Sequence, residues 1–339
     1  MAASKKQEIP DIYTLDQIER AIKTPSFAKD LIHGIEEGFV ALEKGEFFAC
    51  PIQTMGTPPF PFVDTKGCAA QTCVKSGYFK GQEYYVIKVA SGGHPMPNSG
   101  LMQVYSQKTG KLKAMLLDNG VLTEIRTAAV GSLACKLLGP SSIEKIGILG
   151  TGIQARYQLR LLPTVTDCRT VLVWGRTPSR SQELCDELLA EGWDVQVADQ
   201  ADDLLKECDL IVTTTCSREP LLGKDLSVLL NRKKAGLHIS CIGSDAPGKM
   251  ELTPELVAQA DFLVADTVVQ SFERGEFQVA VRNGLVQSDS IISLGSLIES
   301  KHLHRRGDGD TRVTIFDSSG VAMQDCVVAQ MTFEALNQR

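Results

Sequence analysis

The stretch Lys145–Ala155, KIGILGTGIQA, joins a short apolar run directly to a glycine-rich turn. The run is typical of a buried parallel strand that ends at Gly150, and a helix is expected to begin near Gly152. In such a turn the backbone can approach a pyrophosphate closely, and the first amides of the helix point toward its negative charge. The stretch therefore predicts a dinucleotide-binding turn. The alternative is a strand-to-helix turn that uses glycine for steric reasons alone.

Further apolar runs follow, at spacings that leave room for helices between them. They are Thr170–Trp174, Asp209–Thr215, His238–Gly243 and Asp261–Ala265. Strands that alternate with helix-length segments are typical of a parallel sheet with helices on both faces. The chain is therefore predicted to be an α/β protein with a central, doubly wound Rossmann-type domain. The long segment before Lys145 is expected to form a second α/β domain that binds the substrate.

The segment after Thr170–Trp174 bears on the choice of cofactor. Folds that prefer NAD place an acidic residue here, where it accepts hydrogen bonds from the ribose hydroxyls. This chain has Gly175–Arg180, GRTPSR, which contains no carboxylate. Arg176 and Arg180 can pair with a 2′-phosphate, and Thr177 can donate to it. The segment predicts NADP(H), with NAD(H) as the alternative if the two arginines are merely solvated.

The composition is that of a soluble enzyme rather than of a nucleic-acid-binding or membrane protein. The 339 residues are 43% hydrophobic and 22% charged, which suits two domains with large cores. A net charge of -6 speaks against nucleic acid as a partner, and no apolar run is long enough to span a membrane. The ten cysteines form no CxxC pair, so no metal site is expected. Because the first residues lack an apolar signal core, we expect a cytoplasmic protein.

Two cationic residues stand out before the glycine-rich turn. Tyr84–Val89, YYVIKV, is typical of a strand, in which Lys88 must either reach solvent or face a cavity. Thr123 is the expected N-cap of a helix with Glu124 and Arg126 in its first turn, where a positive charge is unfavourable. A bound anion, either a cofactor phosphate or a substrate carboxylate, would remove this penalty. The alternative is a surface interaction between Arg126 and Glu124.

Several blocks, taken together and in this order, resemble the ornithine cyclodeaminase and mu-crystallin family. They are Leu122–Ala129 (LTEIRTAA), the turn GTGIQA, Gly243–Leu252 (GSDAPGKMEL) and Thr314–Asp325 (TIFDSSGVAMQD). The resemblance extends from about Tyr84 to the C-terminus. It implies a substrate-binding and dimerisation domain over residues 1–125, completed by a C-terminal helix at 321–339, and a Rossmann NAD(P)-binding domain over 126–320. It also implies a homodimer that acts on a small molecule.

The resemblance implies roles for individual residues. Lys88 matches the family lysine that holds the substrate, and Arg126 matches the arginine between the substrate carboxylate and the cofactor. Asp245 matches the catalytic acid/base, and it follows His238–Gly243 at the carboxyl end of a strand, where such sheets bind ligands. An Asx turn before Pro247 is the alternative for Asp245. The predicted cofactor contacts are Arg126, Thr127, Gly150, Gly152, Ile153, Gln154, Gly175, Arg176, Thr177, Arg180, Thr215, Lys249, Ser318 and Gly320.

The chain departs from the family at Gln53. The family usually has an arginine in a Pro-x-Arg motif where this chain has CPIQT. Gln53 is assigned to the substrate site, but an amide cannot grip a carboxylate as an arginine does. Either Lys88 and Arg126 hold the carboxylate alone, or the substrate is not a simple α-amino or α-imino acid. Ile52–Asp64 is expected to cover the substrate, and His94 either matches a turn seen in cyclodeaminases or is an ordinary loop histidine.

Three functions fit this set of residues. In a reductase, NADPH delivers hydride to the carbon of a cyclic ketimine, or of the imine of a 2-oxo acid, and Asp245 supplies a proton. In an ornithine or lysine cyclodeaminase, tightly bound NAD oxidises the amino acid and the same hydride returns after ring closure. A binding protein like mu-crystallin would bind NADPH with little turnover. The expected NADP(H) preference favours the reductase, an NAD(P)-dependent oxidoreductase, and Lys88, Arg126 and Asp245 together speak against a binding protein.

Overall fold

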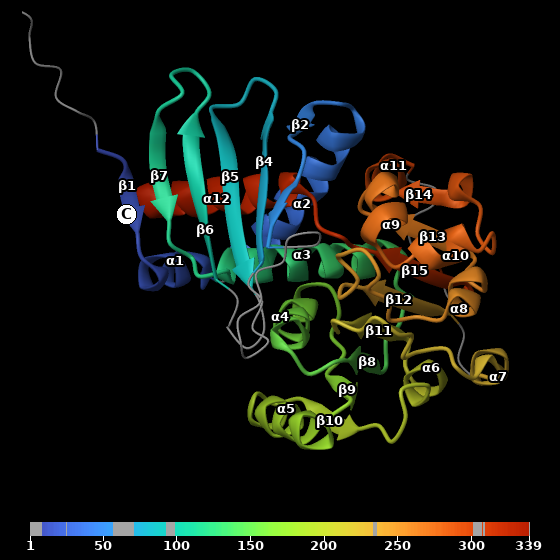
Figure 1. The fold of residues 1–339 in the computed structure, drawn as a ribbon. Helices are drawn as coiled ribbons and strands as arrows, with labels where there is room; N and C mark the ends of the chain where they lie inside the picture. Colours follow the sequence, from blue (N-terminus) through green and yellow to red (C-terminus); the bar gives the residue numbers. More distant parts are fainter. Residues whose placement is uncertain are drawn as a thin grey trace, which may run out of the picture. The chain divides into compact units, whose positions relative to one another are not determined.

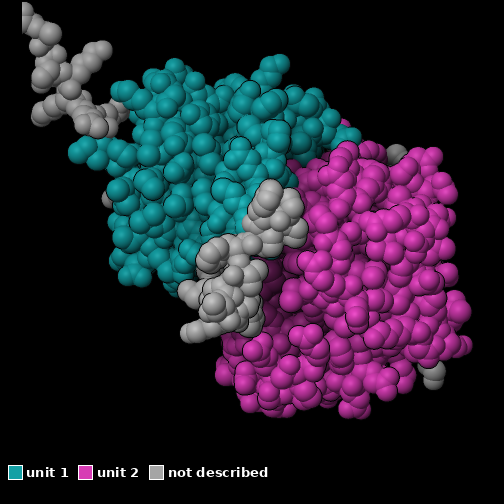
Figure 2. All heavy atoms as spheres, viewed as in Figure 1, with its two compact units in different colours: residues 1–126, 322–339 teal, residues 127–321 magenta. Residues whose placement is uncertain are grey.

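The chain divides into two units in a computed structural model (Figures 1 and 2). The structure describes residues 9–24, 26–56, 71–92, 99–232, 236–300, 307 and 309–338. Unit 1 comprises residues 1–126 and 322–339, and unit 2 comprises residues 127–321. Each boundary lies one residue from the expected position. His94 and residues 57–64 of the segment expected to cover the substrate lie outside the described residues.

Unit 1 is built on a seven-stranded sheet. Its strands lie in the order β1-β7-β6-β5-β4-β2, and β3 also pairs with β4. The pair of β1 and β7 is parallel, and the other pairs are antiparallel. The strands are β1 (Asp11–Tyr13), β2 (Phe47–Ala49), β3 (Gln53–Met55), β4 (Gln71–Phe79), β5 (Tyr84–Gly92), β6 (Ser99–Ser106) and β7 (Leu112–Leu116).

The C-terminal helix covers one face of this sheet. Helix α12 (Ala322–Asn337) contacts β4 and β5 on one side and α1 (Leu15–Ile22) and α2 (Phe27–Glu43) on the other (Figure 1). Because side chains alternate across a strand, Val86 and Lys88 of β5 are buried toward α12, whereas Ile87 is half-buried on the opposite face. The end of the chain thus completes the unit that its beginning forms.

Helix α3 (Val121–Leu138) begins in unit 1 and continues in unit 2. The prediction that Thr123 caps it was wrong, because the helix begins two residues earlier. Asn119 and Gly120 take left-handed backbone conformations that turn the chain, and the carboxylate of Asp118 accepts the Leu122 amide at 3.0 Å. The capping carboxylate therefore comes from the turn before the helix.

Unit 2 contains an eight-stranded sheet in which every pair is parallel. The strand order is β10-β9-β8-β11-β12-β15-β13-β14. The strands are β8 (Ile146–Leu149), β9 (Thr170–Trp174), β10 (Asp194–Val197), β11 (Leu210–Thr213), β12 (Leu237–Cys241), β13 (Phe262–Ala265), β14 (Ile291–Ser293) and β15 (Val313–Asp317). The predicted doubly wound α/β fold is confirmed.

Helices pack against both faces of this parallel sheet. Leu210 and Val212 of β11 belong to one buried apolar cluster and Ile211 to another, so the strand is buried on both sides. The helices are α4 (Ile153–Leu161), α5 (Pro178–Ala190), α6 (Asp203–Glu207), α7 (Leu226–Leu230), α8 (Pro254–Ala258), α9 (Val268–Arg274), α10 (Gln278–Arg282) and α11 (Leu294–Glu299), with 3-10 turns at Leu162–Thr164 and Ser288–Ser290. In the part of the chain that the structure describes, no helix is both long and apolar enough to cross a membrane.

Candidate functional site

A buried group of charged side chains lies in unit 1, where β5, α3 and α12 meet. The Lys88 ammonium lies 2.9 Å from both carboxylate oxygens of Asp325. The Arg126 guanidinium donates from Nε to Asp325 at 3.0 Å and from Nη1 to the Gln324 amide oxygen at 2.7 Å. All four residues are at most 5% exposed. One carboxylate thus joins Lys88 and Arg126, which were predicted to share a site. The alternative, a surface interaction between Arg126 and Glu124, was wrong because Arg126 is buried.

The sequence brings these groups together through three separate elements. Lys88 is on the face of β5 that packs against α12, and Arg126 is in the second turn of α3. Asp325 is in the first turn of α12, where the helix dipole favours a negative charge. Asp325 and Gln324 were not predicted as site residues, although both belong to the block Thr314–Asp325.

A second buried lysine, Lys75, lies directly opposite Lys88. The two residues are paired in the register of β4 and β5, so their side chains leave the same face of the sheet. Lys75 is 8% exposed. Sequence reasoning missed it, although QTCVKSGYF places a lysine inside an otherwise weakly polar strand much as YYVIKV places Lys88.

The charges in this group shift one another's pKa values. Burial lowers the pKa of Lys75 to about 8, and repulsion by Lys88 adds to the effect. Burial also lowers the pKa of Lys88, against the attraction of Asp325. For Asp325, burial acts to raise the pKa, but Lys88, Arg126 and Lys75 together hold it below its ordinary value. Asp325 is therefore the charged counter-ion of the group.

Gln53 does not join this group. It lies on β3 with an exposed side chain, in register with Val74 of β4. Because residues alternate along a strand, Val74 and Gln53 belong to the face opposite that of Lys75 and Lys88. The register therefore separates the predicted substrate residue Gln53 from the buried cations.

In unit 2, the predicted glycine turn lies between β8 and β11, where the strand order reverses. Gly150 has φ +116°, and a Cβ there would lie 2.7 Å from Thr214 Oγ1, so the position requires glycine. Gly152 is the N-cap of α4, and a Cβ there would meet nothing within 4 Å. Ile153 and Gln154 form the first turn of α4. Open space before these amides fits a bound pyrophosphate.

The predicted cofactor segment follows β9 beside this turn. The amide of Gly150 donates to the Trp174 carbonyl at 2.8 Å, and a Cβ on Gly175 would lie 2.7 Å from Thr151 Cγ2. Arg176 is exposed, as is Arg180 in the first turn of α5, and Thr177 is the N-cap of that helix. Both guanidinium groups are thus available to a ligand.

Other predicted cofactor residues are held by hydrogen bonds within unit 2. The Thr127 carbonyl on α3 accepts from Gln158 of α4 at 3.2 Å. The Thr215 amide donates to the buried carboxylate of Glu251 at 2.5 Å, and so does the Gly243 amide at 3.0 Å. Glu251 therefore ties together the ends of β11 and β12, where the loops that carry Thr215 and Asp245 begin.

Asp245, the predicted catalytic acid/base, is on the surface of unit 2. Its side chain is 54% exposed, and Lys249 Nζ lies 2.5 Å from Oδ1. Its carbonyl accepts from Arg274 Nε at 3.0 Å. The partner of the carboxylate is thus an ammonium group, rather than the backbone amide that an Asx turn would supply. Lys249 holds Asp245 in place.

The loop Ser318–Gly320 is fixed by Asp266 at the end of β13. The Gly320 amide donates to this carboxylate at 2.7 Å, and the Ser319 hydroxyl donates at 3.2 Å. The Ser318 hydroxyl also contacts the Asp266 carboxylate, at 3.4 Å. A predicted cofactor loop is thus anchored by a buried acid that the sequence did not single out.

Asp317, just before this loop, is expected to make stability depend on pH. Burial raises its pKa to about 8, and the nearby Asp266 adds to the shift, while the Ser271 hydroxyl donates to it at 2.5 Å. Between about pH 4 and about pH 8 the folded state holds a proton that the unfolded chain lacks, so the free energy of unfolding falls as pH rises, by roughly 1.4 kcal/mol per pH unit.

Asp317→Asn keeps a neutral side chain at every pH and should flatten the fall of the melting temperature between pH 6 and pH 8. Asp186→Asn, on the exposed side of α5, is the control, and a wild-type slope in Asp317→Asn would contradict the assignment.

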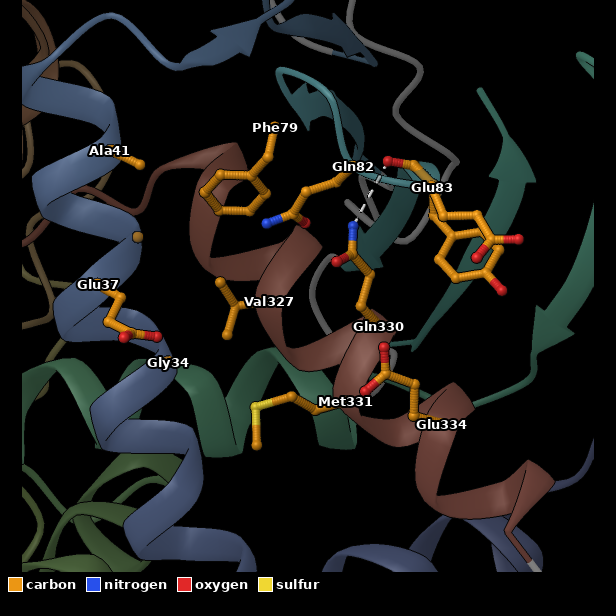
Figure 3. A pocket seen from close by; sticks show the side chains of 12 residues that line it. Gly34, Glu37, Ala41, Phe79, Gln82, Glu83, Val327, Gln330, Met331 and Glu334 are labelled. Atoms are coloured by element: carbon orange, nitrogen blue, oxygen red, sulfur yellow. Dashed lines mark hydrogen bonds between the residues drawn. The ribbon is translucent and has the colours of Figure 1, made fainter. Parts of the chain in front are cut away.

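A cavity of about 560 Å³ in unit 1 is separate from the buried cations. Figure 3 shows Glu37 of α2, Glu83 before β5 and Glu334 of α12 around an apolar floor that includes Val327 and Met331. Its charged lining residues are all acidic. Because these acidic side chains repel a carboxylate, the cavity does not suit a carboxylate substrate.

Comparison with known proteins assigns the family. The sequence profile of the ornithine cyclodeaminase/mu-crystallin family matches residues 15–339. The iminosuccinate reductase of Paracoccus denitrificans is 35% identical over 231 residues, covering 68% of each chain. The alanine dehydrogenase of Archaeoglobus fulgidus is 32% identical over 237 residues, covering 69% of each chain.

Solved structures agree over nearly the whole chain. The Paracoccus denitrificans iminosuccinate reductase in complex with NAD+ has a TM-score of 0.81 at 27% identity and covers 97% of both chains. An archaeal alanine dehydrogenase dimer with bound NAD has a TM-score of 0.82 at 26% identity and likewise covers 97% of both chains. This chain therefore belongs to the ornithine cyclodeaminase/mu-crystallin family.

Proposed function

We propose that this protein is an NAD(P)-dependent oxidoreductase that reduces the C=N bond of an imino acid to give an amino acid. The imino acid is a cyclic ketimine or the imine of a 2-oxo acid with an amine. The observation that carries the proposal is the buried group of Lys88, Arg126 and Asp325, in which two cations share one carboxylate. Relatives named iminosuccinate reductase and alanine dehydrogenase support this reaction class.

In this proposal each group has a distinct role. Lys88 and Arg126 bind the substrate carboxylate, and Asp325 keeps both cations oriented. Asp245, held by Lys249, supplies the proton that the new amine nitrogen requires. The glycine turn at Gly150 and the first amides of α4 hold the cofactor pyrophosphate. When bound, the nicotinamide supplies the hydride to the imine carbon.

Oxidation of NADPH and NADH by the purified protein tests this function. Cyclic ketimines, and 2-oxo acids with ammonia or methylamine, are the substrates, while ornithine and lysine with NAD+ are assayed in parallel for ammonia release. Cofactor oxidation that depends on the imine would support the reductase. Ammonia release without net cofactor change would instead show a cyclodeaminase, and tight NADPH binding without turnover would show a binding protein.

We further propose that the cofactor is NADP(H), with Arg176 and Arg180 at the 2′-phosphate. Both side chains are solvated in the segment that follows β9, which carries no carboxylate. Each charge-assisted hydrogen bond contributes about 1.5–3 kcal/mol, or roughly 10- to 150-fold in affinity. Arg176→Ala/Arg180→Ala should therefore raise the Kd of NADPH at least about 10-fold and leave that of NADH nearly unchanged, as measured by fluorescence titration. An equal change for both cofactors would refute the assignment and favour NAD(H), the cofactor bound in the related structures.

We propose a homodimer formed through the face of the unit 1 sheet opposite α12. That face carries half-buried apolar side chains such as Ile87 and the stacked rings of Tyr85 and Tyr105, whose centroids are 4.9 Å apart. A related alanine dehydrogenase is a dimer. Ile87→Glu should convert the dimer to monomer in light scattering, because it places a charge in the interface. Leu189→Glu, at an exposed leucine of α5, should not, and an unchanged mass for Ile87→Glu would exclude this face.

We place the protein in the cytosol. The cysteines that the structure describes are free, and most of them are buried. Reduced cysteines of this kind fit a reducing compartment.

A further inference from the structure

We propose that Gln278 is a positioning residue for Asp245, the group proposed to supply the proton. Gln278 is the first residue of α10, and its side chain contacts the main chain of the loop 244–249, which carries Asp245. This inference rests on the proposed function and deepens it, because it names a residue that holds the proton donor in place.

The loop 244–249 needs support from the rest of unit 2, because much of it is exposed. Asp245 and Gly248 are exposed, and Gly248 has φ +78°. Exposed loops open at little cost in free energy, whereas a misplacement of about 1 Å at a reacting group can lower the rate about 10²-fold. The Ser244 hydroxyl donates to the Lys249 carbonyl at 3.0 Å, and the Lys249 ammonium holds the Asp245 carboxylate. These two contacts are internal to the loop, so they do not attach it to the rest of the unit.

Gln278 attaches the loop through both ends of its side-chain amide. Its Oε1 accepts from the Gly248 amide at 3.0 Å, and its Nε2 donates to the Lys249 carbonyl at 3.0 Å. Nε2 also donates to the Gly275 carbonyl at 2.8 Å, and Gln278 is only 2% exposed. A buried amide with partners at both ends is held in one orientation, so it fixes the two loop residues that it contacts. Lys249 in turn holds Asp245 through their ion pair.

Two other side chains from outside the loop contact its main chain, but they are closer to solvent. Arg274 of α9 donates to the Asp245 carbonyl at 3.0 Å, and Arg218 donates to the Pro247 carbonyl at 3.3 Å. Arg274 is half-buried and Arg218 is exposed, so water competes for both hydrogen bonds. Gln278 is the buried one of the three, and its loss should loosen the loop most.

Gln278 is itself held against the parallel sheet. The main-chain amides of Glu276 and Phe277, directly before it, donate to the carboxylate of Asp317 at the end of β15. The Glu276 carboxylate accepts from the Leu252 amide at 2.7 Å, a short distance after the loop. These residues are all buried. The amide of Gln278 is thus presented to the loop from a rigid part of unit 2, as a positioning residue requires.

Gln278→Met in the full-length protein tests this role, because it removes the side-chain hydrogen bonds and keeps the length of the side chain. The variant should fold, since the Lys249 carbonyl keeps the Ser244 hydroxyl and the exposed Gly248 can bind water. We expect kcat for imine reduction to fall about 10- to 100-fold, because the proton donor is displaced, while the Kd of NADPH stays within a few fold. Arg282→Met, at an exposed residue of the same helix, is the control and should retain wild-type kcat.

A double-mutant cycle with Asp245→Asn separates positioning from a general structural role. If Gln278 acts through Asp245, then Gln278→Met should lower kcat by less than about 2-fold once Asp245 has been replaced. The same loss of about 10- to 100-fold in both backgrounds would overturn the inference, because Gln278 would then act on turnover by another route.

Amide hydrogen exchange keeps the test independent of turnover. Peptides that cover the loop 244–249 should exchange faster in Gln278→Met than in the wild type, while peptides elsewhere in unit 2 and the whole of Arg282→Met should exchange at wild-type rates. Unchanged exchange of the loop in Gln278→Met, or faster exchange throughout unit 2, would overturn the inference. If the loop alone loosens but the wild type reduces no imino acid, the proposed function fails and the role of Gln278 in holding the loop stands.

Discussion

Asp245→Asn is expected to lower kcat by about 10²- to 10⁴-fold, because general acid–base catalysis contributes about that much and an amide cannot exchange the proton. The change is nearly isosteric and affects an exposed side chain, so the fold should be unaffected. Loss of the ion pair with Lys249 should alter the free energy of unfolding by no more than about 1 kcal/mol. The Kd of NADPH should stay within a few fold of the wild-type value.

Steady-state kinetics and a fluorescence titration of NADPH measure these two quantities on the same preparation. Glu207→Gln is the matched control, since it removes another partly exposed ion pair of unit 2, that with Lys145 at 2.8 Å. This variant should retain wild-type kcat. If Asp245→Asn weakened cofactor binding as strongly as it slowed turnover, Asp245 would be a cofactor-binding residue rather than the proton donor.

Asp325→Asn should destabilise the fold far more than Asp245→Asn does. It removes the carboxylate that contacts Lys88 and Arg126 and leaves their charges buried. Breaking a buried ion pair by removing one partner costs about 3–5 kcal/mol. Because the pKa of Asp325 is below its ordinary value in the folded state, its contribution is present at neutral pH and is lost as pH falls through that lowered pKa. The difference between wild type and Asp325→Asn should therefore be large at pH 7 and shrink in strong acid.

Thermal and urea unfolding across this pH range measure the effect. Lys88→Met/Asp325→Leu removes both charges of one pair and should recover only part of the lost stability, because the Arg126 guanidinium still loses the carboxylate that it contacts. It should not recover activity, since Lys88 is the residue proposed to bind the substrate carboxylate. If the Asp325→Asn variant were as stable as the wild type at pH 7, Asp325 would not be the counter-ion of the group.

Local patterns in the sequence were sufficient for much of unit 2. The run Thr170–Trp174 is β9 without change, and the strand before Gly150 ends where the glycine turn requires. Apolar runs of this length, separated by helix-length segments, have few ways to be buried other than in a parallel sheet with helices on both faces. Only glycine suits position 150, because its φ is positive and a Cβ there would contact Thr214 too closely.

The cap of α3 and the role of Gln53 could not be predicted from local patterns. Thr123 and Asp118 are both good capping residues, and the choice between them depends on the left-handed turn at Asn119 and Gly120. Gln53 was assigned by resemblance, but strand register decides which face a side chain joins, and a shift of one residue reverses it.

The sequence alone determined the kind of fold, the nucleotide turn and the presence of isolated cations in apolar segments. Each of these depends on neighbours within a few positions. Only the tertiary structure decided that Lys75, Lys88 and Arg126 share Asp325, which lies 237 residues after Lys88. Such a pairing depends on the register of β4 with β5 and on α12 packing against both strands. Charge balance in a buried site is a property of side chains brought together in space, and no local pattern specifies it.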